Sequence, residues 1–374
     1  MVAPMDRVRN IAAFGGAVWQ YLREGWLLYA LAIAGGAIFA WLHVPLPWMI
    51  GALVFTTLAK LKGIAGQVPI PVRMTGQLIV GTAVGLYFTP QALGEVLTHF
   101  QAMVLVAFVT IALGGLSAVL MHRFGQVDGR TAYFACMPGG PAEMANLAER
   151  AGAAPAPVAL SQTLRIAALV LIIPPTITWS GIGGAPDLAR FDGVVVVGEL
   201  LLLGLAAVAA ARLLKLLRVP NPWFLGPVAA ASVLTASEAT LTTMPYALIA
   251  VGQLCLGASL GSHFDRAFVA RIRPQLRGIV VCTAFLMASC ALLAVVVGKL
   301  SDLPIAVMIL ATAPGSLTEM CLTAKALDLS VALVTAFHLV RLFIIVPLTP
   351  VIFAAIRPWC ARDARPDQAP ATGD

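Results

Sequence analysis

The stretch Met137-Pro-Gly-Gly-Pro-Ala-Glu-Met144 interrupts one apolar segment, and Ala313-Pro-Gly-Ser-Leu-Thr-Glu-Met320 interrupts another far downstream. Proline removes a backbone donor and clashes with the preceding helical turn, and glycine tolerates backbone angles that other residues avoid. Each stretch should therefore unwind a helix. Each should then restart one, with Gly140 as the cap and Pro141 in the first turn of one copy, and Ser316 as the cap of the other.

Composition indicates a protein that crosses a membrane several times. Of the 374 residues, 60% are hydrophobic and 11% are charged, and the mean hydropathy is +0.92. Apolar stretches recur from Trp26 to Ile356, many close to the ~20 residues that a spanning helix needs. The net charge is +7, but the basic residues sit in short loops between apolar stretches. That distribution is typical of topology signals rather than of a nucleic-acid-binding face.

The chain is an internal duplication. Pro45-Leu-Pro-Trp48-Met-Ile-Gly51 returns as Pro220-Asn-Pro-Trp223-Phe-Leu-Gly226, and the stretch from Gly76 to Gly85 returns from Gly252 to Gly261. Glutamate, arginine and proline positions repeat with one offset of 176 (319 − 143, 341 − 165, 350 − 174). We expect an interfacial segment at 1–25, membrane repeats at 26–180 and 194–356, a linker at 181–193 and a disordered tail at 357–374.

The basic residues also predict that the two repeats have opposite orientations, because Lys and Arg mark cytoplasmic loops. Each repeat has six apolar segments. Basic residues follow the second and fourth segments of the first repeat (Lys60, Lys62, Arg73, Arg123, Arg130), but the first and third of the second repeat (Arg212, Lys215, Arg218, Arg266, Arg271, Arg273, Arg277). Each repeat must then cross an odd number of times, so one segment is re-entrant, and the broken one is the natural candidate.

We therefore expect an all-α polytopic membrane protein made of two inverted repeats of about five transmembrane helices, each with a broken or re-entrant helix. It should lie in the bacterial inner membrane with both termini in the cytoplasm. Inverted repeats with interrupted helices at corresponding positions are typical of secondary transporters, whose substrate sites form near the midplane. The predicted function is alternating-access transport of a small molecule or ion, with no catalytic residues, metal or cofactor.

The expected substrate site comprises both breaks and the charged or polar side chains near them. Its residues are Pro138, Gly139, Gly140, Pro141, Glu143, Asn146, Arg165, Pro314, Gly315, Ser316, Thr318, Glu319, His338 and Arg341. Gln77, Gln253 and Thr323 complete the polar set.

The charged members each have two interpretations. Glu143 and Glu319 have the spacing of capping-box residues, and a carboxylate at membrane depth can also bind a cation or proton. Arg165 and Arg341 lie within long apolar segments and must find partners in the protein interior. Those partners are a glutamate, carbonyls freed at the breaks, or a substrate carboxylate.

Gln162 and His338 occupy the same repeat position, one turn before the arginines and on the same face. His338 is either a proton relay or a satisfied buried imidazole. The spacing of Gly81 with Gly85, and of Gly257 with Gly261, predicts close helix packing. The six cysteines lack metal-ligand spacing and are interpreted as small buried residues.

These paired motifs resemble the membrane AbrB duplication family of Gram-negative bacteria, over nearly the whole chain. The resemblance rests on residues 45–51, 76–85 and 137–144 with their second-half echoes. It implies kinship with the cation/proton antiporter and anion transporter superfamily, in which two broken helices cross at the substrate site.

Family members carry two labels, transcriptional regulator and candidate ammonia monooxygenase. The chain has no recognisable DNA-binding module, so a role in gene expression would be indirect, as a membrane sensor or regulator. It also has no evident metal site for oxygenase chemistry, which makes the monooxygenase the third choice. The expected partners are a small-molecule or ion substrate and the lipid bilayer, with a homodimer as a possible assembly and no direct nucleic-acid contact.

Overall fold

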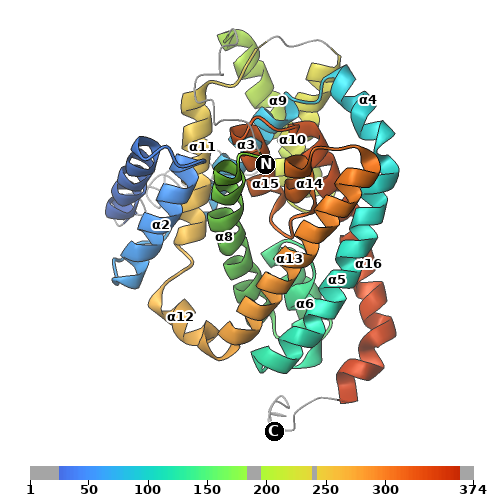
Figure 1. Cartoon of the computed structure of the whole chain (residues 1–374). Coiled ribbons are helices and arrows are strands. Elements are labelled where there is room, and N and C mark those ends of the chain that lie inside the picture. Colours follow the sequence, from blue (N-terminus) through green and yellow to red (C-terminus); the bar gives the residue numbers. More distant parts are fainter. Residues whose placement is uncertain (1–24, 183–194, 238–241, 363–374) are drawn as a thin grey trace, which may run out of the picture.

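The computed structural model describes residues 25–182, 195–237 and 242–362, and the regular structure within these ranges is helical (Figure 1). The predicted N-terminal segment, most of the predicted linker and residues 363–374 lie outside the described residues. The last helix, α16, runs to Arg362, six residues into the predicted tail.

The helices of the two repeats follow the same order. After the helix Gly25–Trp41, the first repeat contains α2 (Pro47–Leu61), α3 (Ile70–Gly85), α4 (Pro90–Thr98), α5 (Phe100–Gly125), α6 (Gly129–Cys136), α7 (Pro141–Arg150) and α8 (Pro155–Ser180). The second contains α9 (Val197–Leu216), α10 (Pro222–Ala236), α11 (Tyr246–Gly261), α12 (Arg266–Ile272), the 3-10 turn η1 (Arg273–Gln275), α13 (Leu276–Ser301), α14 (Ile305–Thr312), α15 (Leu317–Ala326) and α16 (Val331–Arg362).

Helix starts repeat with the offset seen in the sequence. The starts of α3, α5, α6, α7 and α8 precede those of α11, α13, α14, α15 and α16 by 176 residues (246 − 70, 276 − 100, 305 − 129, 317 − 141, 331 − 155). The duplication is therefore visible helix by helix.

Both predicted helix breaks are confirmed. α6 ends at Cys136 and α7 begins at Pro141, while α14 ends at Thr312 and α15 begins at Leu317. The two caps have nearly the same extended backbone, with φ −75° and ψ 146° at Gly140 and φ −76° and ψ 142° at Ser316. The same local chemistry thus gives the same backbone path in each repeat.

The helices have the length and composition of a membrane protein. Within the described residues, five are long and apolar enough to cross a bilayer: Phe100–Gly125, Pro155–Ser180, Val197–Leu216, Arg266–Ser301 and Val331–Ile356. Four shorter apolar helices accompany them: Gly25–Trp41, Pro47–Leu61, Pro222–Ala236 and Tyr246–Gly261. The all-helical membrane fold predicted from the composition is confirmed.

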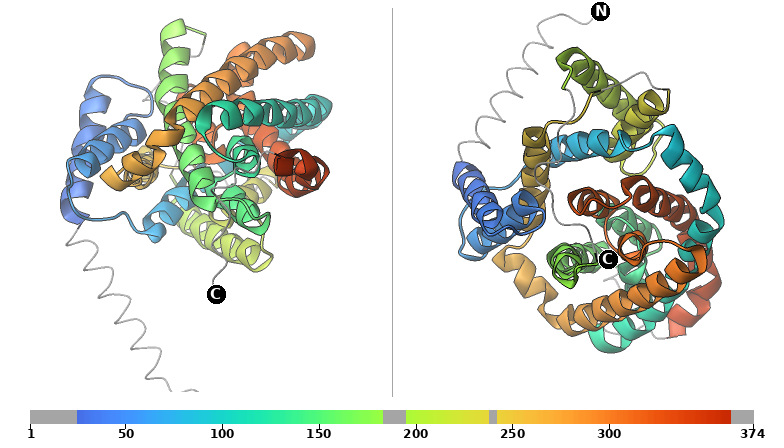
Figure 2. Two further views of the ribbon diagram at one scale, coloured as in Figure 1. Left: turned by 90° about the horizontal axis from the view of Figure 1, so that it is seen from below. Right: turned by 45° about the horizontal axis from the view of Figure 1, so that its top comes forward.

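The helices pack in two sets. The flanking set comprises Gly25–Trp41, α2, α3, α9, α10 and α11, in which α2 packs against α11, and α3 against α10 and α11. The central set comprises α5 to α8 and α13 to α16, around the contact of α5 with α13. Figures 1 and 2 show α2 and α11 on one side of the molecule and α5, α13 and α16 on the other. α3 joins the sets by packing against α15 and α16.

Glycine spacing serves close helix packing, as predicted. A Cβ at Gly81 or Gly85 would collide with the backbone of Phe224 or Val228 on α10. In the other repeat, a Cβ at Gly257 or Gly261 would collide with the backbone of Met49 or Leu53 on α2. Small residues let the helix backbones approach this closely.

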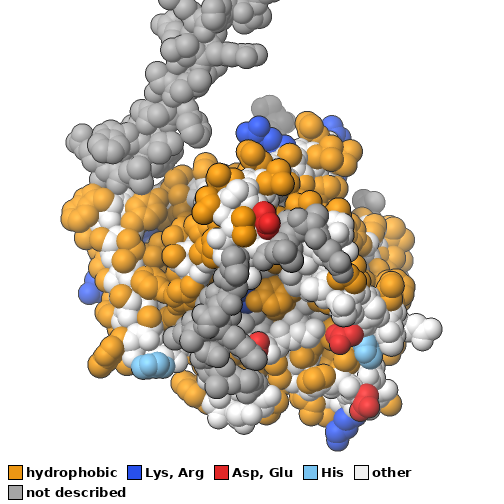
Figure 3. Space-filling view, turned by 90° about the horizontal axis from the view of Figure 1, so that it is seen from above, with side chains coloured by type: hydrophobic (Ala, Val, Ile, Leu, Met, Phe, Trp, Pro, Cys, Tyr) orange, Lys and Arg blue, Asp and Glu red, His pale blue; other side chains and the backbone are white. Residues whose placement is uncertain are grey.

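The opposite orientation of the two repeats stays a prediction, and two observations agree with it. Cys282 Sγ donates to the carbonyl of Ser117 at 3.2 Å, and Gly278 packs against Gly125. The contact moves from residue 282 to 278 on α13 as it moves from residue 117 to 125 on α5, so these two counterpart helices run antiparallel. The counterparts α4 and α12 lie near opposite ends of the molecule (Figure 1). Apolar side chains cover most of the α4 end, with charged ones scattered among them (Figure 3).

Replacing Gly257 by alanine should lower the melting temperature of the detergent-solubilised protein. Its Cβ would meet the carbonyl oxygen of Met49, which belongs to a backbone that cannot swing away. Overpacking of this kind costs about 1–3 kcal/mol. The matched control is Gly204→Ala, because within the described residues nothing lies within 4 Å of a Cβ there. An unchanged melting temperature for Gly257→Ala would contradict the packing interpretation.

Opposite orientations predict different accessibility for two exposed, repeat-related helices. A cysteine at Gly94 on α4 should react with a membrane-impermeant maleimide from the periplasm, and one at Ala270 on arginine-rich α12 only after the inner membrane is opened. The unsubstituted chain measures the reactivity of the native cysteines. Labelling of both positions from the same side would show parallel repeats.

Candidate functional site

One cavity, of about 340 Å³, lies where the two breaks meet. Ten of the fourteen predicted site residues line it: Pro138, Gly139, Gly140, Pro141, Glu143, Asn146, Gly315, Ser316, His338 and Arg341. The other four lie outside its wall. Arg165, Thr318 and Glu319 are buried in the helix packing, and Pro314 lines a different pocket. The structure thus brings the two breaks together in space, and whether this cavity binds a substrate stays a prediction.

The flanking set contributes residues that the predicted site lacked. From α3 they are Ile70, Arg73 and Met74, which lie beside Gln77 of the predicted polar set. From the start of α10 and the loop before it they are Pro220, Asn221, Pro222 and Trp223, and the central set adds Ala142, Leu317 and Leu342. Gln77 and residues 220–223 belong to the repeated motifs, and repetition was the signal that could have placed them at the site. Arg73 was interpreted only as a topology signal.

Gln77 and Asn221 connect two flanking helices in the cavity wall. Gln77 Nε2 donates to Asn221 Oδ1 at 3.0 Å, across the α3–α10 contact. At the related contact of α2 with α11, Trp48 Nε1 donates to the hydroxyl of Tyr246 at 3.2 Å. Its counterpart Trp223 has no partner for its indole N–H among the described residues. The two copies of the motif therefore make different polar contacts.

Both intramembrane arginines bind carbonyls freed at the breaks. Arg165 donates from Nη1 to Cys136 O at 3.1 Å and from Nη2 to Met137 O at 3.3 Å. Arg341 donates from Nη1 to Ala313 O at 2.6 Å and from Nη2 to Gly315 O at 3.2 Å. The last residues of a helix leave carbonyls without intrahelical donors, and lipid offers none. Of the partners considered, the described residues supply carbonyls rather than a glutamate.

The residue one turn before each arginine completes the arrangement. Gln162 contacts Arg165 through Oε1 and donates from Nε2 to Phe134 O at 3.1 Å and Met137 O at 2.8 Å. His338 Nδ1 lies 2.7 Å from Arg341 Nη2, and its Nε2 lies 2.9 Å from Leu310 O. Gln162 therefore shares a helix face with Arg165, and His338 with Arg341, as predicted. The buried His338 imidazole has a partner at each nitrogen.

The two glutamates differ in a way that their spacing did not predict. Glu143 Oε2 accepts from the Gly140 N–H at 3.2 Å, as a capping residue does. Ser316 is the N-cap of α15 but makes no side-chain capping bond, so the predicted capping box of the second copy is wrong. The Glu319 side chain is only 7% exposed. Its Oε2 and the neighbouring Thr318 Oγ1 have no partner within the described residues.

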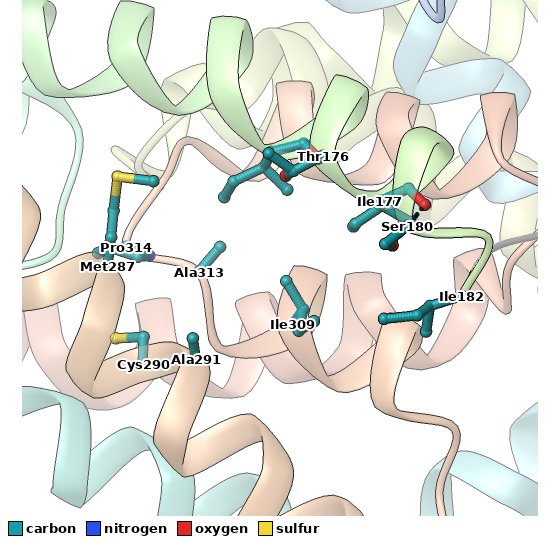
Figure 4. Close-up of a pocket in the computed structure, with 11 residues that line it drawn as sticks. Thr176, Ile177, Ser180, Ile182, Met287, Cys290, Ala291, Ile309, Ala313 and Pro314 are labelled. Carbon is teal, nitrogen blue, oxygen red and sulfur yellow. Dashed lines mark hydrogen bonds between the residues drawn. The ribbon is translucent and has the colours of Figure 1, made fainter.

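The far side of each break faces a second, apolar pocket. One, of about 280 Å³, places Thr176, Ile177 and Ser180 of α8 opposite Met287 and Ala291 of α13 (Figure 4). Ala313 and Pro314 line this pocket, whereas the next residues, Gly315 and Ser316, line the central cavity.

A repeat-related pocket lies at the first break. It is lined by Phe108, Ile111, Ala112, Gly115, Ala118, Val119, Tyr133, Met137, Ile352 and Ile356. Met137 follows α6 there as Ala313 follows α14, so each break separates an apolar pocket from the central cavity.

The cysteines are mostly buried, as predicted. Cys136, Cys282, Cys290 and Cys321 are buried and Cys255 is half-buried. In the part of the chain that the structure describes, no three His, Cys, Asp or Glu side chains are grouped as metal ligands would be.

Comparisons with known proteins match most of the chain. A family model described as transition state regulatory protein AbrB matches residues 48–357. The chain is 27% identical over 353 residues to protein YhjN of Bacillus subtilis (strain 168), covering 88% of this chain and 92% of that protein. It is 26% identical over 330 residues to “Putative regulator AbrB” of Escherichia coli (strain K12), covering 87% of this chain and 94% of that protein.

Replacing Arg165 by glutamine should lower the melting temperature. The buried carbonyl of Cys136 would lose its guanidinium donor and that of Met137 would keep only Gln162. A buried polar group left unsatisfied costs about 1–3 kcal/mol. Thermal unfolding in detergent measures the effect. The control Arg150→Gln removes the same charge from an exposed position on α7 and should change little. Equal melting temperatures for the two variants would show that Arg165 does not hold the first break.

Proposed function

We propose that this chain, which belongs to the AbrB family, is a secondary transporter of a small solute, working by alternating access in the bacterial inner membrane. One observation carries the proposal: the two breaks, one from each repeat, meet in a single cavity. Secondary transporters bind substrate where discontinuous helices meet, because their helix ends offer unpaired backbone groups to a ligand at membrane depth. The bilayer and a small solute or ion are then its partners.

The break in repeat 2 is the proposed barrier between the two sides. It spans only Ala313 to Ser316, with the central cavity on one side and the apolar pocket of Figure 4 on the other. Arg341 bridges the barrier, because it binds Ala313 O and Gly315 O with one guanidinium. A rearrangement of this segment would change the side from which the cavity can be reached.

The cavity lies between the two helix sets, which supports a relative movement of those sets. Its walls come from α3 and the start of α10 in the flanking set, and from α7, α15 and α16 in the central set. Arg73, at its edge, belongs to the basic group that the positive-inside rule assigns to the cytoplasm. On that topology, the conformation described here opens toward the cytoplasm.

The second candidate is a membrane sensor that affects gene expression indirectly. The observation that favours it is the printed name of the Escherichia coli relative, which describes a regulator. The same cavity would then bind a ligand without moving it across the membrane. Transport and binding measured on one preparation separate the two functions.

The purified protein in proteoliposomes should accumulate or exchange at least one compound from a defined mixture of organic anions, amines, amino acids and ammonium, measured by mass spectrometry of the lumen. Arg341→Ala should abolish this flux, because it frees the barrier carbonyls and removes a cavity charge. The control Arg271→Gln alters an exposed arginine on α12. Binding of a compound without flux above that of protein-free vesicles would favour the sensor.

A further inference from the structure

The duplication provides an internal comparison for the cavity, because each position in one repeat has a counterpart in the other. Three polar residues in the cavity wall have buried apolar counterparts. Arg73 corresponds to Ile249 and Asn146 to Leu322 (249 − 73 = 322 − 146 = 176), and Asn221 corresponds to Leu46 (221 − 46 = 175). The fold therefore does not require polarity at these positions. Asn221 serves the α3–α10 contact through Gln77, whereas a ligand in the cavity gives Arg73 and Asn146 a role that helix packing does not.

Four helices begin in the wall of this cavity: α3 at Ile70, α7 at Pro141, α10 at Pro222 and α15 at Leu317. The start of a helix carries unpaired N–H groups and the positive end of the helix dipole. Neither Asn221 nor Ser316 caps its helix with a side-chain bond. The N–H groups at the start of α15 are thus left for a ligand. At α10, Pro222 has no N–H and the Phe224 N–H already donates to Asn221 O, so the Trp223 N–H is the one left there. The combined field of the four helix starts favours an anion.

The charged side chains favour the same sign. Arg341 is 5% exposed and holds the second break. Arg73 is half-buried, forms no hydrogen bond within the described residues and interacts electrostatically with Glu143. Glu143 is the acidic residue of the described cavity wall, and its Oε2 accepts from the Gly140 N–H. Glu319, in the first turn of α15, is buried outside that wall. Arg73 and Arg341 against Glu143 leave the wall with an excess of one positive charge, and a guanidinium binds a carboxylate with two parallel hydrogen bonds.

We infer that the ligand of this cavity is a small organic anion whose carboxylate binds between Arg73 and the start of α15. The inference rests on the proposed function and names the class of its substrate. α3, which carries Arg73, packs directly against α15 and α16, and Arg73 lines the same cavity as the start of α15 and Arg341. Apolar wall residues give the carbon skeleton a place that phosphate or sulfate would not use: Ile70, Met74, Leu317 and Leu342.

Ligand-dependent thermal stability of the full-length protein in detergent tests this inference, at constant ionic strength. The carboxylate probes are lactate, succinate and benzoate; the inorganic probes are phosphate and sulfate; the cationic probes are ammonium and putrescine. A ligand that binds only the folded state raises the melting temperature. At least one carboxylate should do so selectively, and Arg73→Gln should weaken its affinity about tenfold or more, which is about 1.4 kcal/mol or more. Arg73→Lys should restore part of the loss.

The control is Arg271→Gln, which makes the same charge change outside the cavity and should leave carboxylate affinity unchanged. The inference is overturned if no carboxylate stabilises the protein, if Arg73→Gln has no effect, or if the inorganic or cationic probes bind in preference. Its failure is distinct from failure of transport. Ammonium flux without carboxylate binding would contradict the inferred anion and support the transport function. Carboxylate binding without flux would support the inferred anion and contradict the transport function.

Discussion

Backbone carbonyls left without donors at membrane depth are the constraint on which this structure depends. When a helix unwinds inside lipid, its backbone N–H and C=O groups lose their partners, and water cannot reach them there. Arg165 and Arg341 solve the problem in the same way in both repeats, each donating to two carbonyls at its break from a helix that lies alongside. The charge of each arginine is stabilised by carbonyl dipoles and the carbonyls by a charged donor. An interrupted helix, and with it the cavity, can therefore persist in an apolar environment.

The features predicted from sequence are those that local chemistry determines. The proline and glycine at each break act within one helical turn, so the ends of α6 and α14 could be located before any packing was known. The common face of Gln162 with Arg165 follows likewise from helical periodicity. The cavity wall contributed by Arg73 and Asn221 could not be predicted, because it depends on how the flanking set docks against the central set. Glu319 shows the limit of a spacing rule, since its side chain turns into the packed interior instead of back over the helix start.

The differences between the repeats carry as much information as their likeness. Two copies with the same helix order must satisfy the same requirements for folding. A polar residue that occurs in only one copy is therefore not required by the fold. His338 and Gln162 both support an arginine and represent two solutions to one structural task. Arg73 and Ile249 perform different tasks, because one lies at a cavity and the other within the core. Divergence within one chain thus separates residues that hold the fold from those that serve the cavity.

The glycine contacts of the flanking set have a mechanical consequence. Where Gly81 and Gly85 meet α10, and Gly257 and Gly261 meet α2, backbone lies directly on backbone, with no long side chains between the helices to change rotamer. Such seams resist sliding, because any shift drives main-chain atoms into each other. The described glycine seams lie within the flanking set, whereas the cavity lies where that set meets the central one. The glycine contacts therefore stiffen the flanking set as a unit without fixing it to the other wall of the cavity.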